Sequence, residues 1–179
     1  MNIVVYCGSR FGNDKKYQEI AYELGKYIAL NKHTLVYGGS NCGIMGEIAT
    51  SCLKHNGKVI GVRPHCFHEG DILDTCTEII YTDSMNQRKA KMIELGDFFI
   101  AFPGGTGTLD EISEVMVERS IEDIDKTYVY LNIDGFYDTL YKFFKELNEK
   151  DFVTDKQLSQ ILMVNNLDEL KDVINNLIF

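Results

Sequence analysis

The clearest chemical pattern lies in residues 103–111, PGGTGTLDE, which follow a short apolar segment. Glycines expose backbone N–H groups without side-chain obstruction, and threonines add hydroxyl donors. The pattern after them predicts a helix from about Leu109, and a helix N-terminus presents free N–H groups with a partial positive charge. We therefore predict a phosphate site formed by Gly104, Gly105, Thr106, Gly107 and Thr108. A loop that only turns the chain from strand to helix is the competing interpretation.

This loop departs from the two best-known nucleotide-binding motifs. The sequence contains no Walker A motif with its phosphate-binding lysine. Gly105 and Gly107 begin a dinucleotide fingerprint, but Asp110 stands where its third glycine belongs. A second glycine-rich segment, residues 38–46, also lacks a lysine. From its sequence, that segment could pack against the ligand or simply turn the chain.

Glu111 allows two interpretations. Thr108 and Glu111 have the spacing of a capping box, in which the glutamate accepts a hydrogen bond from the backbone at the helix start. Glu111, Glu114 and Glu118 also share one helical face, as a solvated stripe would. In the functional interpretation, the Glu111 carboxylate lies beside the phosphate loop and hydrogen-bonds a sugar or a water molecule.

A second unusual stretch, SMNQRKAKMIELG, begins with a capping box at Ser84, which predicts a helix over residues 85–95. Arg88 falls on the apolar stripe of that helix, and Lys89 flanks the stripe. Arginines on a buried face are rare unless they are paired. Arg88 therefore forms an ion pair at the core edge, or points into the ligand site to bind phosphate or pair with Glu111.

The elements that must position these residues alternate along the chain. Short apolar segments predict strands, and apolar residues spaced by three and four predict helices. This alternation is typical of an α/β fold with a mainly parallel sheet, which binds ligands beyond the carboxyl ends of its strands. The predicted strands are Ile3–Cys7, Thr34–Tyr37, Lys58–Val62, Glu78–Tyr81, Phe98–Phe102, Tyr128–Leu131 and Ile161–Val164. The predicted helices are Lys15–Leu30, Ile44–His55, Met85–Leu95, one from about Leu109, Tyr137–Glu149 and Leu167–Leu177.

Length and composition limit the class of protein. The 179 residues predict one domain, spanning 1–179, and the net charge of −9 argues against nucleic acid or an anionic membrane as a partner. No apolar run reaches the roughly 20 residues of a membrane-spanning helix, and the N-terminus lacks a signal-peptide pattern. We therefore expect a cytoplasmic protein. The odd number of cysteines without C-x-x-C spacing, and histidines without ligand spacing, predict neither disulfides nor a metal site: Cys7, Cys42, Cys52, Cys66, Cys76; His33, His55, His65, His68.

Taken together, the motifs resemble those of the LOG ("Lonely Guy") family, the cytokinin riboside 5′-monophosphate phosphoribohydrolases. The family motif P-G-G-x-G-T-x-x-E is complete, and an R-K pair precedes it by fifteen residues. The resemblance covers almost the whole chain. Its motifs are Cys7–Ser9 (CGS), Val36–Gly46 (VYGGxxxGxMG), Val59–Pro64 (VIGVxP), Arg88–Lys89 (RK), Pro103–Glu111 and Asn132–Asp138 (NxxGxYD, with Phe136 at its third variable position).

The resemblance implies a Rossmann-like, doubly wound homodimer that needs no cofactor and no metal. It implies hydrolysis of the N-glycosidic bond of a nucleoside 5′-monophosphate, either AMP or a cytokinin riboside 5′-monophosphate, to free base and ribose 5-phosphate. It also implies that Arg88 and Glu111 are catalytic. Ser9 and Lys89 join the five residues of the phosphate loop as substrate-binding residues. The older family name, lysine decarboxylase, has no pyridoxal-phosphate motif to support it here.

The chain departs from the family pattern at positions expected near the base and a dimer partner. Asn86 stands where the family often has histidine, Val117–Glu118 replaces a Thr-Trp pair, and Ser120–Lys126 replaces a Gln-Leu-Gly segment. A family acidic residue after the third strand corresponds to Glu69 or Asp71. The preferred base is therefore left open. A nucleotide-binding or sensing module without hydrolysis is the alternative function, although binding alone would not need both Arg88 and Glu111.

Overall fold

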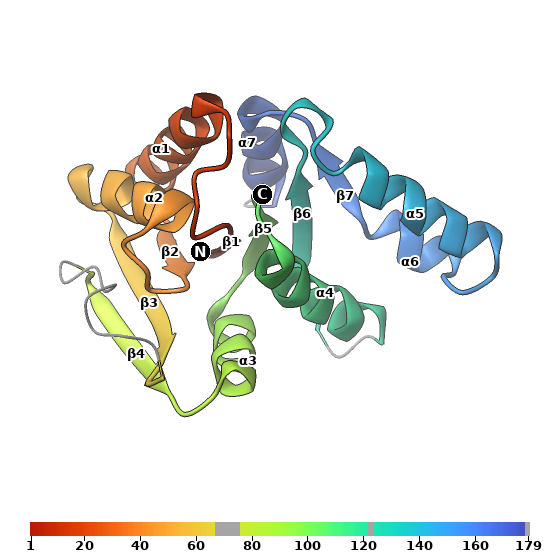
Figure 1. The fold of residues 1–179 in the computed structure, drawn as a ribbon, viewed down its shortest axis with the longest axis horizontal. Coiled ribbons are helices and arrows are strands. Elements are labelled where there is room, and N and C mark those ends of the chain that lie inside the picture. Colours follow the sequence, from red (N-terminus) through yellow and green to blue (C-terminus); the bar gives the residue numbers. More distant parts are fainter. Residues whose placement is uncertain (67–75, 122–123, 178–179) are drawn as a thin grey trace.

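The computed structural model describes residues 1–66, 76–121 and 124–177. Its centre is a seven-stranded sheet in which every pairing is parallel, with the order β4-β3-β2-β1-β5-β6-β7 (Figure 1). The inner strands are almost wholly apolar and buried, as expected for strands covered on both faces. The strands are β1 (Asn2–Tyr6), β2 (Thr34–Tyr37), β3 (Lys58–Pro64), β4 (Glu78–Thr82), β5 (Phe98–Ala101), β6 (Thr127–Leu131) and β7 (Leu162–Val164).

Helices cover both faces of the sheet and divide the core into two clusters. One cluster joins the sheet to α1 (Lys15–Leu30), α2 (Gly43–Lys54) and α7 (Leu167–Asn176). The other joins it to α3 (Met85–Leu95), α4 (Thr106–Ser120) and α5 (Asp138–Glu149). This arrangement confirms the predicted Rossmann-like, doubly wound α/β fold. A 3-10 turn, η2 (Ile133–Gly135), precedes α5, and the short helix α6 (Asp155–Ser159) follows it.

The order of the strands reverses between β1 and β5. From β1 the chain builds outward to β2, β3 and β4, and then returns to place β5 on the other side of β1. Tyr6 pairs with Ala101, and the N–H of Phe102 donates to the carbonyl of Tyr6 at 2.9 Å. The loops that follow these two strands therefore start side by side. This reversal is the switch point at which parallel sheets bind ligands.

Three predicted elements match the structure residue for residue: α1, β2 and α3. The predicted start of α4 was wrong, because the helix begins at Thr106 and not near Leu109. The capping box at Thr108 was wrong for the same reason. Gly105 is the N-cap residue and Thr108 already lies inside the first turn. Neither η2 nor α6 was predicted from the sequence.

None of the helices in the described ranges is long and apolar enough to cross a membrane.

Candidate active site

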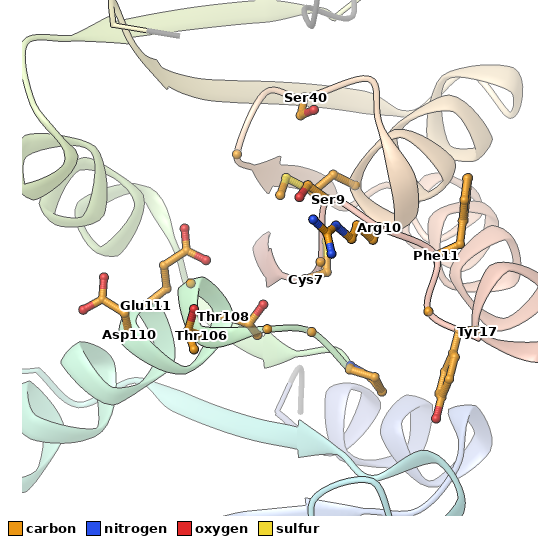
Figure 2. Close-up of a pocket in the computed structure, with 18 of the residues that line it drawn as sticks. Cys7, Ser9, Arg10, Phe11, Tyr17, Ser40, Thr106, Thr108, Asp110 and Glu111 are labelled. Carbon is orange, nitrogen blue, oxygen red and sulfur yellow. The ribbon is translucent and has the colours of Figure 1, made fainter. Parts of the chain in front are cut away.

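A pocket of about 730 Å³ opens at the carboxyl ends of β1 and β5 (Figure 2). It is lined by the segments that follow β1, β2 and β5, by Arg63 near the end of β3, and by the N-terminal turns of α3 and α4. Its lining therefore combines the CGS motif, the glycine-rich segment 38–46 and the predicted phosphate loop. The lining residues are Cys7, Gly8, Ser9, Arg10, Phe11, Gly12, Tyr17, Gly38, Ser40, Met45, Arg63, Met85, Arg88, Pro103, Gly104, Gly105, Thr106, Gly107, Thr108, Asp110, Glu111 and Phe136.

The predicted phosphate loop forms one wall of this pocket. No side chain caps the start of α4, so its first N–H groups are available as donors. A Cβ added to Gly105 or Gly107 would meet no atom within 4 Å. Gly104 is packed tightly instead, because a Cβ there would lie 2.9 Å from the backbone nitrogen of Gly8 and overlap the Thr108 hydroxyl. That hydroxyl is buried and has no hydrogen-bond partner among the described residues.

The glycine-rich segment after β2 supports the loop that carries Ser9. Gly43 has a φ of +57°, and a Cβ at this position would overlap the backbone of Ser9. The N–H of Met45 donates to the carbonyl of Gly8 at 3.4 Å. The segment thus packs against the pocket wall, and its own Gly38 and Met45 line the pocket. The segment therefore does more than turn the chain, and whether it also contacts a bound ligand stays a prediction.

Arg88 and Glu111 form a buried ion pair inside the pocket. Arg88 Nη1 lies 2.5 Å from Glu111 Oε1, and the two side chains are 6% and 8% exposed. Arg88 Nε also donates to the carbonyl of Val62 at 3.0 Å. Both interpretations of Arg88 therefore hold at once, since it is paired at the core edge and lines the pocket. Gly38 makes room for it, because a Cβ there would overlap the guanidinium.

Two acidic groups on the pocket wall, the Glu111 carboxyl and the Cys7 thiol, have raised pKa values. Burial raises the pKa of Glu111, and the Arg88 cation opposes this shift only in part. Burial, followed by the charge of Glu111, raises the pKa of the Cys7 thiol well above its usual range. Cys7 is therefore a protonated thiol at neutral pH and a poor nucleophile. Of the two carboxylates that line the pocket, Asp110 and Glu111, Glu111 is the buried one.

Of the other predicted site residues, one lies in the pocket wall and one lies outside it. Ser9 lines the pocket, whereas Lys89 is not among the lining residues. The Lys89 ammonium lies 2.7 Å from Glu114 and 3.0 Å from Asp110, which ties α3 to α4. These bonds, that to Glu114 first, raise the pKa of Lys89. The candidate acids Glu69 and Asp71 lie outside the described residues.

Sequence reasoning missed several lining residues. Arg63 is fully buried at the end of β3, and no pattern on that strand distinguished it. Arg10 and Phe11 directly follow the CGS motif, so their proximity to Ser9 was the available signal. Tyr17 and Phe136 come from α1 and from the segment before α5. Nothing in their spacing links them to the phosphate loop.

A hydrogen-bonded chain supports the phosphate loop from behind. The buried Tyr137 hydroxyl donates to the carbonyl of Phe102 at 2.9 Å, immediately before Pro103. Asn132 holds this tyrosine, because its Oδ1 accepts from the Tyr137 N–H at 2.7 Å. The Asn132 side-chain amide in turn donates to Asp138 at 2.7 Å. The NxxGxYD motif thus supports the phosphate loop through these hydrogen bonds.

Within the described ranges, no group of three His, Cys, Asp or Glu side chains could hold a metal ion.

Comparison with solved structures supports the fold. The molybdenum cofactor binding protein of Rippkaea orientalis superposes with a TM-score of 0.76 at 24% identity, covering 99% of this chain and 97% of that chain. The molybdenum cofactor carrier protein of Chlamydomonas reinhardtii superposes with a TM-score of 0.74 at 22% identity, with the same coverage. At this level of identity the likeness concerns the fold alone.

Comparison of sequences identifies the family. The family model described as "Possible lysine decarboxylase" matches residues 45–174. The cytokinin riboside 5′-monophosphate phosphoribohydrolase of Rhodococcoides fascians is 35% identical over 174 residues, which cover 93% of this chain and 85% of that protein. A probable enzyme of the same name from Oryza sativa is 37% identical over 169 residues, covering 94% and 68%. An enzyme of that name from Arabidopsis thaliana is 36% identical over 169 residues, covering 94% and 79%. The chain therefore belongs to the LOG family.

Proposed function

We propose that this protein hydrolyses the N-glycosidic bond of a nucleoside 5′-monophosphate to free base and ribose 5-phosphate. The observation that carries the proposal is the buried Arg88–Glu111 pair in the same pocket as the phosphate loop. The names of the relatives at 35–37% identity support the same reaction. AMP and the cytokinin riboside 5′-monophosphates are the candidate substrates.

The proposed mechanism follows from the order of groups along α4. The 5′-phosphate accepts hydrogen bonds from the first turn, where the buried Thr108 hydroxyl is a further donor. Glu111 lies five residues after Thr106 in the same helix, about 7.5 Å along its axis, a span comparable with a phosphorylated ribose. The carboxylate is then beside C1′ of the sugar.

Hydrolysis breaks the C1′–N bond through a state with positive charge on the sugar ring. The Glu111 carboxylate stabilises that charge and orients the attacking water. The water oxygen bonds to C1′, and one water proton ends on the nitrogen of the released base. Arg88 favours the ionised form of Glu111 and fixes its orientation. Binding energy from the phosphate lowers the barrier at C1′.

A product assay tests this function. Purified protein is incubated with AMP, isopentenyladenosine 5′-monophosphate or adenosine, and free base and ribose 5-phosphate are separated by chromatography. We expect release from at least one monophosphate, and release from adenosine at least 100-fold slower, because adenosine lacks the phosphate that the loop binds. Comparable turnover of adenosine and AMP would remove the role of the loop. Nucleotide binding without release would favour the alternative, a sensing module.

The rate of hydrolysis should depend on pH through Glu111. Burial raises the pKa of this carboxyl, so it protonates at a higher pH than an ordinary glutamate, whose pKa is about 4.3. Since the ionised form is the active one, kcat/KM rises with pH through the raised pKa. We expect the acid limb of the kcat/KM profile to lie above pH 4.3. A limb at or below that value, measured where the protein stays folded, would contradict the assignment.

Loss of the hydrogen bond from Tyr137 to the Phe102 carbonyl should weaken substrate binding more than it slows the chemistry. Tyr137→Phe removes the hydroxyl that donates to Phe102, at a cost of about 1 kcal/mol in stability. The loop then shifts relative to Glu111, and we expect KM for the nucleotide to rise about fivefold with kcat changed less than twofold. Steady-state kinetics and thermal unfolding check this. Tyr141→Phe, on α5 and outside the pocket lining, is the matched control. Equal kinetics for both variants would leave Tyr137 with a packing role only.

The other expectations for this chain are part of the same proposal. We propose that residues 1–179 act as one hydrolase domain, as a homodimer in the cytoplasm, with a small-molecule nucleotide as the partner and no nucleic acid or membrane. Ser9 and Lys89 are proposed to bind substrate, Ser9 directly from the pocket wall. Exposed apolar side chains on α3 and α4 support self-association: Met85 and Val117, with Ile121 just beyond α4. Sedimentation velocity measures the oligomeric state.

A further inference from the structure

The pocket continues past the phosphate loop on the side away from Glu111. In Figure 2, Thr106 and Thr108 lie between Glu111 on one side and Phe11 and Tyr17 on the other. All five residues line the same continuous cavity of about 730 Å³. The side of the cavity beyond the loop is formed by three aromatic rings, Phe11, Tyr17 and Phe136, which we call the aromatic end.

The aromatic end is held by several independent contacts. The rings of Tyr17 and Phe136 meet edge to face, with centroids 6.2 Å apart. Phe136 also packs edge to face on Tyr137 at 4.8 Å, the tyrosine that supports the phosphate loop. An ion pair between Lys16 and Asp134 joins the start of α1 to the turn before Phe136.

The backbone before Phe136 is shaped for this position. Asp134 and Gly135 have φ values of +49° and +75°, the left-handed region that few side chains favour. On the opposite side, Gly12 has a φ of +78° and a Cβ there would lie 3.1 Å from the Tyr17 ring. Despite these contacts, Phe11 and Phe136 each keep 44% of their surface exposed. The rings therefore present apolar faces that a planar group can cover.

A nucleoside monophosphate would not reach these rings, given the proposed function on which this inference rests. With the phosphate on the first turn of α4 and C1′ beside Glu111, the base extends past Glu111 and away from Thr106. The aromatic end then faces the oxygens of the 5′-phosphate. Only a group bonded to one of those oxygens would extend toward Phe11, and Arg10 beside it supplies a positive charge for the linking phosphate.

We propose that the aromatic end binds an aromatic group esterified to the 5′-phosphate, so that nucleoside 5′-phosphodiesters are substrates as well as monophosphates. The same bonds break and form as in the proposed hydrolysis of a monophosphate. The C1′–N bond breaks, the water oxygen bonds to C1′, and a water proton ends on the base nitrogen. The phosphate ester stays intact, and the products are free base and a 5-phosphoribose ester.

The test uses two esters of AMP with equal charge, adenosine 5′-(phenyl phosphate) and adenosine 5′-(methyl phosphate). Release of adenine is measured for both and for AMP. Ring stacking predicts kcat/KM about fivefold higher for the phenyl ester than for the methyl ester. Phe11→Ala should bring this ratio close to one. Phe143→Ala, which removes an exposed ring on α5 outside the pocket, should leave the ratio at about five.

Two outcomes overturn the proposal. The first is equal kcat/KM for the two esters with the unaltered protein. The second is a Phe11→Ala variant that lowers kcat/KM equally for AMP and both esters, because the base itself would then occupy the aromatic end. Phe136→Leu repeats the test from the other wall.

Binding measured by calorimetry tests this inference even if the proposed hydrolysis does not occur. If no nucleotide is hydrolysed, the dissociation constants of the two esters still report on the aromatic end. Tighter binding of the phenyl ester, lost in Phe11→Ala and kept in Phe143→Ala, supports the subsite without catalysis. Equal dissociation constants for the two esters overturn it.

Discussion

Replacing Glu111 by glutamine should lower kcat for nucleotide hydrolysis about 1000-fold while AMP still binds. The amide keeps the shape of the side chain and an oxygen that can accept from Arg88 Nη1. It carries no charge, so it can neither stabilise the positive sugar ring nor accept a proton from water. Loss of a positioned acid or base of this kind costs about 10²–10⁴ in rate. The measurement is single-turnover release of free base, together with calorimetric binding of AMP.

Glu114→Gln is the matched control for this experiment. Glu114 lies one turn further along α4, and its side chain is 30% exposed where it pairs with Lys89. Its replacement removes the same charge from the same helix, and we expect kcat to change less than threefold. A folded Glu111→Gln protein that keeps a tenth or more of its activity would reduce Glu111 to a structural ion-pair partner of Arg88.

The largest effect on stability is expected from Arg88→Ala. Removing one partner of a buried pair leaves the other charge uncompensated, which costs about 3–5 kcal/mol. Here the Glu111 carboxylate would stay buried without its cation, and the carbonyl of Val62 would lose a donor. Urea unfolding measures the loss. Hydrolysis should fall with it, because loss of the Arg88 cation raises the pKa of Glu111 further and lowers its ionised fraction.

The stability lost in Arg88→Ala should become smaller as the pH falls. Burial already raises the pKa of Glu111, and loss of Arg88 removes the group that opposes the shift. A carboxyl whose folded pKa exceeds its unfolded pKa destabilises the fold when both states are ionised. The variant should therefore regain stability as the pH falls through the raised pKa. A loss that grows on acidification would contradict this account.

Lys91→Ala provides the comparison for an ordinary surface pair. Lys91 lies on the same helix as Arg88 and pairs with Glu94 at 2.7 Å, with side chains 32% and 67% exposed. Exposed pairs contribute about 0–1 kcal/mol, so we expect a change below 1 kcal/mol and little dependence on pH. If both variants lost equal stability, the buried pair would contribute no more than the surface pair.

The fold could be predicted because each element carries its own periodicity. The helix with apolar residues spaced by three and four was predicted over the residues that α1 occupies, and buried strands such as β5 are continuously apolar. The start of α4 was mispredicted because Thr106 and Gly107 have low helix propensity and resemble turn residues. In the structure both residues are exposed in the first turn of α4 and line the pocket, so no apolar periodicity marks the start of the helix there.

The site was predicted in part. Arg88 stood out because a cation on an apolar stripe needs a partner, and Glu111 was one of the partners considered. Their contact joins residues 23 positions apart, so it depends on how α3 and α4 cross the sheet. The aromatic end joins Phe11 to Phe136 through the tertiary fold alone. No local pattern encodes that proximity, so it could not be predicted from the sequence.

The contact between Gly38 and Arg88 has a consequence for how related chains diverge. The guanidinium is held by Val62 and Glu111, and a Cβ at position 38 would overlap its Nη2, so even an alanine would press on the ion pair. Substitutions at positions 38 and 88 are therefore expected to be coupled during evolution. A residue larger than glycine at position 38 should be tolerated best in related chains whose side chain at position 88 is shorter than arginine.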